Sequence, residues 1–116
     1  MAADSDTASP ESHEPVVRLI RMLAHARRFD IQGKALKDIQ DLNLDPTEDV
    51  RDFLVQVSSE DVEKEEPDHG IPDKQAVVFR KVFEGRSLYV KVSVRVEKDH
   101  DMVVLSFKTP EGRWLT

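Results

Sequence analysis

The stretch GRSLYVKVSVRV (residues 85–96) alternates strictly between apolar and polar side chains from Leu88 to Val96. An apolar residue at every second position is the pattern of a β-strand that buries one face. The polar positions carry a phenol, a serine and two cations, with no acid before Glu97. Because the chain as a whole has a formal net charge of −6, this strand is locally cationic. The apolar positions are Leu88, Val90, Val92, Val94 and Val96, and the polar ones are Tyr89, Lys91, Ser93 and Arg95.

Two more segments of strand-like composition flank this one, AVVFRKVF (76–83) before it and MVVLSFK (102–108) after it. The intervening EGRS and EKDH have ordinary lengths for hairpin loops. The sequence therefore predicts an antiparallel meander of three strands. In the last of these strands, one parity is expected to be buried, namely Val103, Leu105 and Phe107.

Helical patterns precede the strands. Three apolar stripes recur at helical spacing, and the third follows a helix-start signature with a capping Asp45, Pro46 in the first turn and an acid two residues later. Residues 58–74 then break the pattern with prolines and acids, and their later part is predicted to be a long surface loop. Helices followed by an antiparallel meander indicate an α+β fold, with N-terminal helices packed on a small antiparallel sheet. The helices are expected to begin near Glu14, Lys34 and Asp45.

Composition limits the possible classes of protein. A chain of 116 residues with 39% hydrophobic and 34% charged residues suits one small domain, expected over 14–116. The absence of cysteine excludes disulfides, thiolate metal sites and cysteine nucleophiles. No apolar run is long enough to span a membrane. The acidic start MAADSDTASPESH (1–13) has no apolar core of a signal peptide, so we expect a disordered tail on a cytoplasmic protein.

The polar faces of the three strands are expected to meet. The loop lengths set Tyr89 opposite Lys108, and Arg80 opposite Lys91, with Ser93 and Ser106 on the same face. Arginine and lysine gathered in this way suit a phosphate group. The alternative is that the long cationic side chains only extend into solvent from a half-exposed sheet.

Other charged features favour structural interpretations. Four arginines in the first predicted helix and just beyond it fit a solvated helix face better than an RNA-binding one. The acids within SSEDVEKEEPD fit a solvated loop better than a pair of catalytic carboxylates, and no metal-ligand spacing recurs. Trp114 is expected to cap the core rather than to dock on a partner. The arginines are Arg18, Arg21, Arg27 and Arg28.

Several of these segments, SSEDVEK, VFRKVF, LYVKVSV and VVLSFK, resemble the MqsR family of bacterial toxins. The resemblance runs from the predicted helix near residue 34 to Lys108 and extends more loosely to RelE- and barnase-like nucleases. It implies a RelE-like fold, cleavage of messenger RNA without a metal or another cofactor, and inhibition by a cognate antitoxin protein. Whether the ribosome is a further partner stays open.

The resemblance also implies catalytic residues. Lys64 ends the S-x-D-x-x-K motif, Tyr89 lies in LYVKV, and Lys108 closes VVLSFK. The active-site glutamine of the family falls on Arg80, which departs from the family pattern but is itself suited to bind phosphate. Family members are usually basic, whereas this chain is acidic.

Three further residues are expected to bind RNA phosphate, namely Lys91, Arg86 and His69. His69, in the PDHG segment, is also a candidate proton carrier. The other histidines are expected to be peripheral, with His13 in the tail and His100 exposed in a hairpin turn.

The sequence thus predicts the toxin of a toxin–antitoxin system, an endoribonuclease that cuts single-stranded messenger RNA through attack by a 2′-hydroxyl. The retained Lys64, Tyr89 and Lys108 favour this enzyme. The alternative is a catalytically degenerate RelE-like module that binds RNA or a protein partner without cleavage. The acidic charge balance and the departure at Arg80 favour that alternative.

Overall fold

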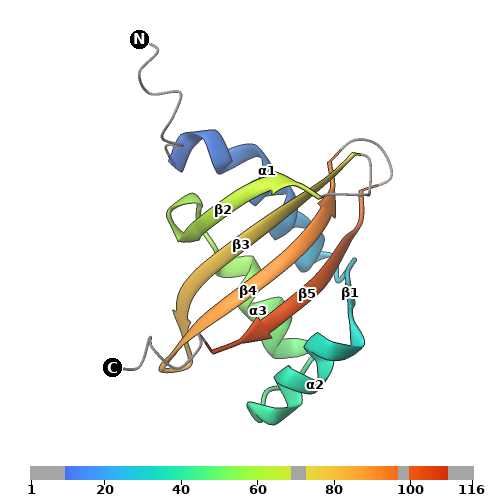
Figure 1. Cartoon of the computed structure of the whole chain (residues 1–116), viewed down its shortest axis with the longest axis vertical. Helices are drawn as coiled ribbons and strands as arrows, with labels where there is room; N and C mark the ends of the chain where they lie inside the picture. Colours follow the sequence, from blue (N-terminus) through green and yellow to red (C-terminus); the bar gives the residue numbers. More distant parts are fainter. Residues whose placement is uncertain (1–9, 69–72, 97–99, 110–116) are drawn as a thin grey trace.

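Helices and strands form an α+β fold in the computed structural model, which describes residues 10–68, 73–96 and 100–109 (Figure 1). Within these residues, three helices accompany one five-stranded sheet of order β1-β5-β4-β3-β2. Only β1 and β5 pair in parallel, and the other neighbours are antiparallel. The elements are α1 (Pro10–His25), β1 (Asp30–Ile31), α2 (Gly33–Asp41), α3 (Glu48–Gln56), the 3-10 turn η2 (Ser59–Asp61), β2 (Val62–Pro67), β3 (Lys74–Phe83), β4 (Arg86–Arg95) and β5 (Met102–Lys108).

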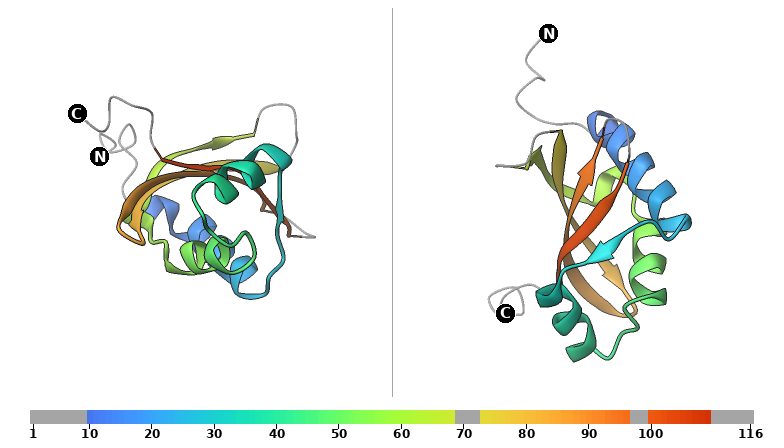
Figure 2. Two further views of the ribbon diagram at one scale, coloured as in Figure 1. Left: turned by 90° about the horizontal axis from the view of Figure 1, so that it is seen from below. Right: turned by 90° about the vertical axis from the view of Figure 1, so that its right-hand side faces the viewer.

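The sheet has one face packed against helices and one that is not. Helices α1 and α3 lie against the same face, while α2 lies at the end of the sheet beside β5 (Figure 2). The face turned away from α1 and α3 is called the outer face below. The predicted α+β class is confirmed, with the sheet mixed rather than purely antiparallel.

The core forms between the sheet and the helices around Phe53 of α3. Its ring packs edge-to-face against Phe83 at 5.6 Å and Phe107 at 5.4 Å between ring centroids, an arrangement that aromatic quadrupoles favour. The alternating apolar residues predicted for β4 supply the sheet side of this core, and Leu88, Val90, Val92 and Val94 are fully buried.

The helix termini agree in part with the sequence signals. Helix α1 begins at Pro10, four residues before the predicted start, so it includes residues 10–13 of the predicted tail. Asp45 caps the start of the third helical segment, because its carboxylate accepts the backbone N–H groups of Thr47 and Glu48 at 2.7 and 3.0 Å. The regular helix α3 then starts at Glu48.

The β3–β4 hairpin is tighter than the sequence predicted. Strand pairing continues to Phe83 and Arg86, so the turn has two central residues, Glu84 and Gly85. Their φ values of 54° and 79° are both positive, as a type I′ turn requires. The predicted pairing of Arg80 with Lys91 is therefore wrong.

Compared with the predicted four-residue loop, the two-residue turn shifts the pairing of β3 with β4 by two positions. Because the shift is even, each side chain stays on its predicted face of the sheet. Arg80 lies directly opposite Tyr89, and Lys91 lies opposite Val78. Lys91 therefore has the apolar Val78 opposite it, and not the like-charged Arg80 that the loop lengths had predicted.

The β4–β5 pairing is confirmed at one end and wrong at the other. Tyr89 pairs with Lys108 as predicted, but a bulge shifts the register beyond Lys91, so that Val92 pairs with Val104. Val104 is fully buried as a result, together with the predicted Phe107. The other two residues assigned to the core, Val103 and Leu105, are only half-buried.

Strand β2 was not predicted, since residues 58–74 were assigned to a broken helical pattern and a loop. It is an edge strand that pairs with β3 and carries a bulge between Val62 and Lys64. Charged residues, a bulge and a terminal proline are usual at sheet edges. Because of them, the segment lacks the alternating apolar pattern from which a strand is predicted. No helix in the described part of the chain is long and apolar enough to cross a membrane.

Candidate anion-binding face

Three of the predicted site residues form one row across the outer face. Arg80 of β3 is directly opposite Tyr89 of β4, which is directly opposite Lys108 of β5. Residues that are opposite in an antiparallel pair share a face and lie about 5 Å apart. Lys108 Nζ lies 5.9 Å from the centroid of the Tyr89 ring, at the outer limit of a cation–π contact. The row therefore presents a phenol between two cations.

The next row supplies two more predicted residues. Lys91 of β4 stands between Val78 and Ser106, and Lys64 of β2 is the residue opposite Val78 on the other side. Lys91 is half-buried, and none of the ion pairs among the described residues involves it. The side chain of Lys64 is 61% exposed and forms an ion pair with Glu66 at 3.6 Å. Both lysines thus lie next to the first row.

An acidic residue also reaches this face. Glu63 is the residue at the bulge of β2, and its Oε1 forms an ion pair with Nη2 of Arg80. The two side chains are partly exposed, at 43% and 26%. Glu63 was not predicted at this site, because its access to Arg80 depends on a strand that was not predicted.

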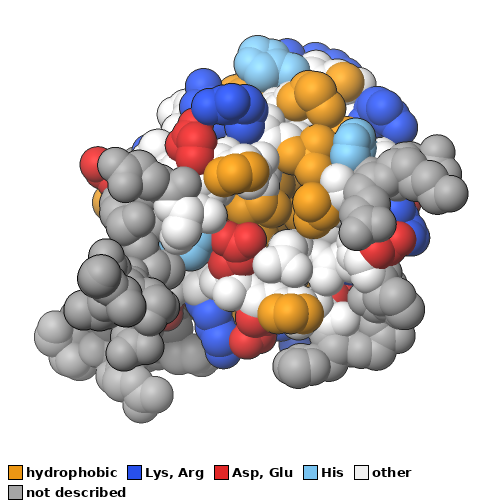
Figure 3. Space-filling model, turned by 90° about the horizontal axis from the view of Figure 1, so that it is seen from above, with side chains coloured by type: hydrophobic (Ala, Val, Ile, Leu, Met, Phe, Trp, Pro, Cys, Tyr) orange, Lys and Arg blue, Asp and Glu red, His pale blue; other side chains and the backbone are white. Residues whose placement is uncertain are grey.

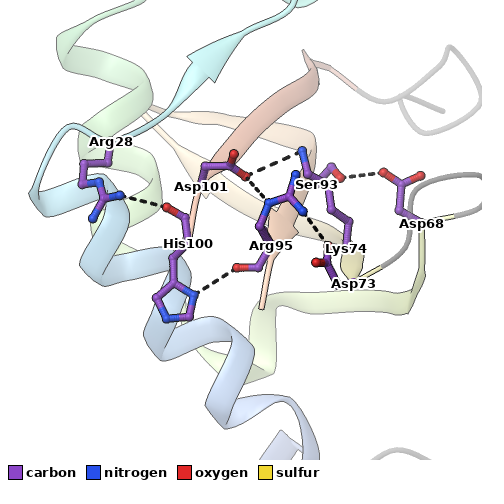
Figure 4. A network of polar contacts seen from close by, with 8 residues as sticks. All are labelled: Arg28, Asp68, Asp73, Lys74, Ser93, Arg95, His100 and Asp101. Atoms are coloured by element: carbon purple, nitrogen blue, oxygen red, sulfur yellow. Dashed lines mark hydrogen bonds and ion pairs between the residues drawn. The ribbon is translucent and has the colours of Figure 1, made fainter. Parts of the chain in front are cut away.

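The opposite end of the outer face is neutralised by acids (Figure 4). Arg95 forms an ion pair with Asp73 at 2.7 Å, and Lys74 forms one with Asp101 at 3.7 Å. Ser93 is buried and donates its hydroxyl to the carboxylate of Asp68 at 2.6 Å. The positive charge of the outer face is therefore concentrated around Tyr89.

Of the two remaining predicted phosphate-binding residues, Arg86 is not brought to this cluster. The Arg86 guanidinium donates to the carbonyl oxygen of Leu42 at 3.1 Å, so Arg86 caps the end of α2. Leu42 follows the last residue of that helix, where a cation is favoured by the helix dipole. His69, like Trp114, lies outside the described residues.

Two histidines are more tightly held than predicted. His13 belongs to α1 rather than to a tail, and its Nδ1 lies 2.7 Å from Oε1 of Glu65 in a partly buried contact. His100 is half-buried, with Nδ1 at 3.2 Å from the carbonyl oxygen of Arg95. Neither histidine lies in the row of Arg80 and Tyr89.

The arginines of α1 and the residues after it are exposed, as their assignment to a solvated surface predicts. Arg27 ends the helix with a φ of 58°, and its guanidinium binds both carboxylate oxygens of Glu48 at 2.9 and 3.2 Å. This hydrogen-bonded ion pair raises the pKa of Arg27. Arg18 is 3.4 Å from Glu14, whose pKa is lowered mainly by a hydrogen bond from the Ser59 hydroxyl.

The cluster around Tyr89 has the chemistry of an anion site. Arg80 offers a planar fork of donors, Lys91 and Lys108 offer point charges, and Tyr89 offers a hydroxyl that donates or accepts. Within the described residues, no three histidine or acidic side chains are grouped so as to hold a metal ion.

Comparisons with protein-family models, with curated proteins and with solved structures find no match for this chain. The likeness to the MqsR family therefore remains a prediction that depends on the four sequence motifs.

Proposed function

We propose that the outer face binds single-stranded RNA and cleaves it without a metal ion, as in a toxin of RelE-like fold. The observation that carries this proposal is the row of Arg80, Tyr89 and Lys108, with Lys91 in the adjacent row. Cations from three neighbouring strands, close to one phenol, supply charge and a proton carrier at one place. The sequence motifs that resemble the MqsR toxins contain all four of these residues.

The cleavage step fits the chemistry of these groups. The ribose O2′ attacks the adjacent phosphorus and gives up its proton, while the bond from phosphorus to O5′ breaks and O5′ takes up a proton. The products are a 2′,3′-cyclic phosphate and a 5′-hydroxyl. Tyr89 or Lys64 exchanges a proton in this step, and Arg80, Lys91 and Lys108 stabilise the charge that develops on the phosphoryl oxygens.

The test uses purified protein and a long single-stranded RNA in the presence of EDTA. Wild-type protein is compared with Tyr89→Phe, with Lys108→Ala and with Lys37→Ala, which removes an exposed lysine from α2. We expect discrete fragments with cyclic phosphate ends from wild type and Lys37→Ala. We expect the rate to fall by about 10²–10⁴-fold in Tyr89→Phe, if the phenol carries the proton, and substantially in Lys108→Ala. Equal rates in all four proteins would contradict the assigned site.

One observation favours a second function, binding without cleavage. Glu63 already neutralises Arg80 on the outer face, and the chain as a whole is acidic. A degenerate module of this kind shifts the mobility of RNA, or binds a protein partner, while the RNA stays intact. The same experiment separates the two functions, because only the enzyme yields cyclic phosphate ends.

A further inference from the structure

One side of α1 carries an apolar stripe that the proposed RNA site does not use. Pro15, Leu19 and Met22 follow one another at the spacing of one helix face, beside the buried stripe that faces the core. Met22 is 51% exposed, which is unusual for a large apolar side chain. The stripe spans eight residues, from Pro15 to Met22, or about 10 Å along the helix.

A groove runs beside this stripe. Pro15 and Val16 of α1 and Val96, just after β4, line a cavity of about 370 Å³, together with polar residues from β2 and β3. Val96 is 41% exposed and lines this cavity together with the helix residues. Seen from above, hydrophobic side chains are gathered between basic and histidine side chains on this side of the molecule (Figure 3). Pro15 belongs both to the apolar stripe and to the lining of the cavity. The cavity and the adjoining stripe are together called the α1 groove, and its apolar residues are Pro15, Val16, Leu19, Met22 and Val96.

Cations flank the α1 groove. Arg18, Arg21 and His25 are exposed on the same helix, on the side of the apolar stripe away from the cavity. Arg28 closes one end, where its guanidinium donates to the carbonyl oxygen of His100 at 3.1 Å. The chain as a whole has a formal net charge of −6, whereas this helix surface is locally basic.

We propose that the α1 groove binds an acidic, amphipathic segment of a partner protein. Apolar side chains of such a segment pack on Leu19 and Met22 and enter the cavity lined by Pro15 and Val96, and its carboxylates meet the arginines along α1. Glu65 and Asp73 also line the cavity, but their carboxylates already contact His13 and Arg95. RNA fits less well, because an apolar surface offers a phosphate backbone little. A two-fold pair of copies of this chain would bring Arg18 and Arg21 against their own counterparts.

This partner would not cover the proposed RNA site. Val96 follows the end of β4, and Lys74 begins β3, whereas Arg80 and Tyr89 pair near the opposite end of the same hairpin. Helix α1, which contributes Pro15 and Val16 to the groove, also lies behind the sheet in Figure 1. The proposal therefore stands independently of RNA cleavage.

The probe is a fluorescein-labelled synthetic peptide of two helical heptads, with leucine on one face and glutamate on the others. A matched peptide carries lysine in place of every glutamate. Binding to the full chain is followed by fluorescence anisotropy, and the contact is mapped from amide chemical shifts of the labelled protein. We expect the acidic peptide to bind, with shifts at Leu19, Met22 and Val96, and the basic peptide to bind at least about tenfold more weakly.

Two variants with the same chemical change test the location. Met22→Glu is expected to weaken binding of the acidic peptide by about tenfold or more. Val82→Glu alters a side chain that is 67% exposed at the other end of the sheet and should bind like wild type. Several results would overturn the proposal: no binding of the acidic peptide, equal effects of the two variants, shifts confined to the outer face, or self-association of the free chain through Met22.

Discussion

Glu63 and Arg80 form an ion pair between the bulge of β2 and the middle of β3, on the outer face. The carboxylate therefore occupies the guanidinium that a phosphate would need. Within the proposed RNA site, Glu63 thus competes with RNA phosphate for Arg80. Removal of the Glu63 charge is therefore expected to raise the affinity for RNA.

Glu63→Gln is expected to strengthen binding of a single-stranded RNA by about two- to fivefold, since a partly exposed ion pair is worth up to about 1 kcal/mol. Glu60→Gln is the matched control, because Glu60 is an exposed acid in the neighbouring turn η2. Fluorescence anisotropy at fixed ionic strength measures both. If the two variants bind RNA equally, Glu63 acts only through net charge, and if neither protein binds RNA, the site itself is refuted.

Lys91→Ala is expected to change how RNA binding depends on salt. Each phosphate contact on a single strand contributes about 0.7 to the slope of log K against log salt. Loss of one contact should therefore reduce the slope by about 0.7, whereas Lys37→Ala, on α2, should leave it unchanged. A titration of labelled RNA at several salt concentrations supplies both slopes. An unchanged slope in Lys91→Ala would place Lys91 away from the RNA backbone.

Two glycine-to-alanine substitutions should have opposite effects on stability. Gly85 has a φ of 79° in the β3–β4 turn, whereas Gly33 opens α2 with no such φ, and an added Cβ meets no atom within 4 Å at either position. Gly85→Ala should lower the free energy of unfolding by about 1–2 kcal/mol, because the left-handed conformation is unfavourable for alanine. Gly33→Ala should raise it by up to about 1 kcal/mol through helix propensity. Urea unfolding of both variants tests the pair, and a neutral Gly85→Ala would argue against the type I′ turn.

Asp45→Ala should lower the melting temperature near neutral pH and have little effect in strong acid. The backbone N–H groups of Glu48 and Thr47 hold the pKa of the Asp45 carboxyl below its ordinary value of 3.8. A lowered pKa means that the ionised cap stabilises the folded state fully above 3.8, and that this contribution is lost as the pH falls through the folded-state value. Thermal unfolding of both proteins across this range should show the difference closing. A difference that stays constant in acid would show that the ionised carboxylate is not what stabilises the helix start.

The central strand and part of its neighbour could be predicted because burial itself restricts the register. The alternation from Leu88 to Val94 leaves one parity for the core, and that parity brings Tyr89 and Lys108 together. The bulge in β5 could not be predicted, since no glycine or proline marks it, and it exchanged Val103 for Val104 in the core.

The partner of Arg80 and the position of Glu63 were not predicted, because the turn and the strand that place them have weak sequence signals. Gly85 after Glu84 is compatible with a two-residue turn, but the loop length alone suggested four residues and gave the wrong partner for Arg80. Strand β2 lacks apolar alternation because it lies at an edge, where charges are tolerated on both faces. Glu63 consequently had no predicted position, although it contacts a predicted site residue.

The two edges of the sheet limit how it could grow by adding strands. On one side β1 has only two residues, Asp30 and Ile31, too few to align another chain. On the other, β2 carries a bulge, three glutamates and Pro67, which lacks an N–H to offer a new strand. A fibril requires each copy to accept a strand at one edge and to offer one at the other. Within the described residues, the outermost strands of this sheet therefore offer no pair of long, regular edges from which copies could stack without end, which disfavours amyloid-like polymerisation as long as the fold is intact.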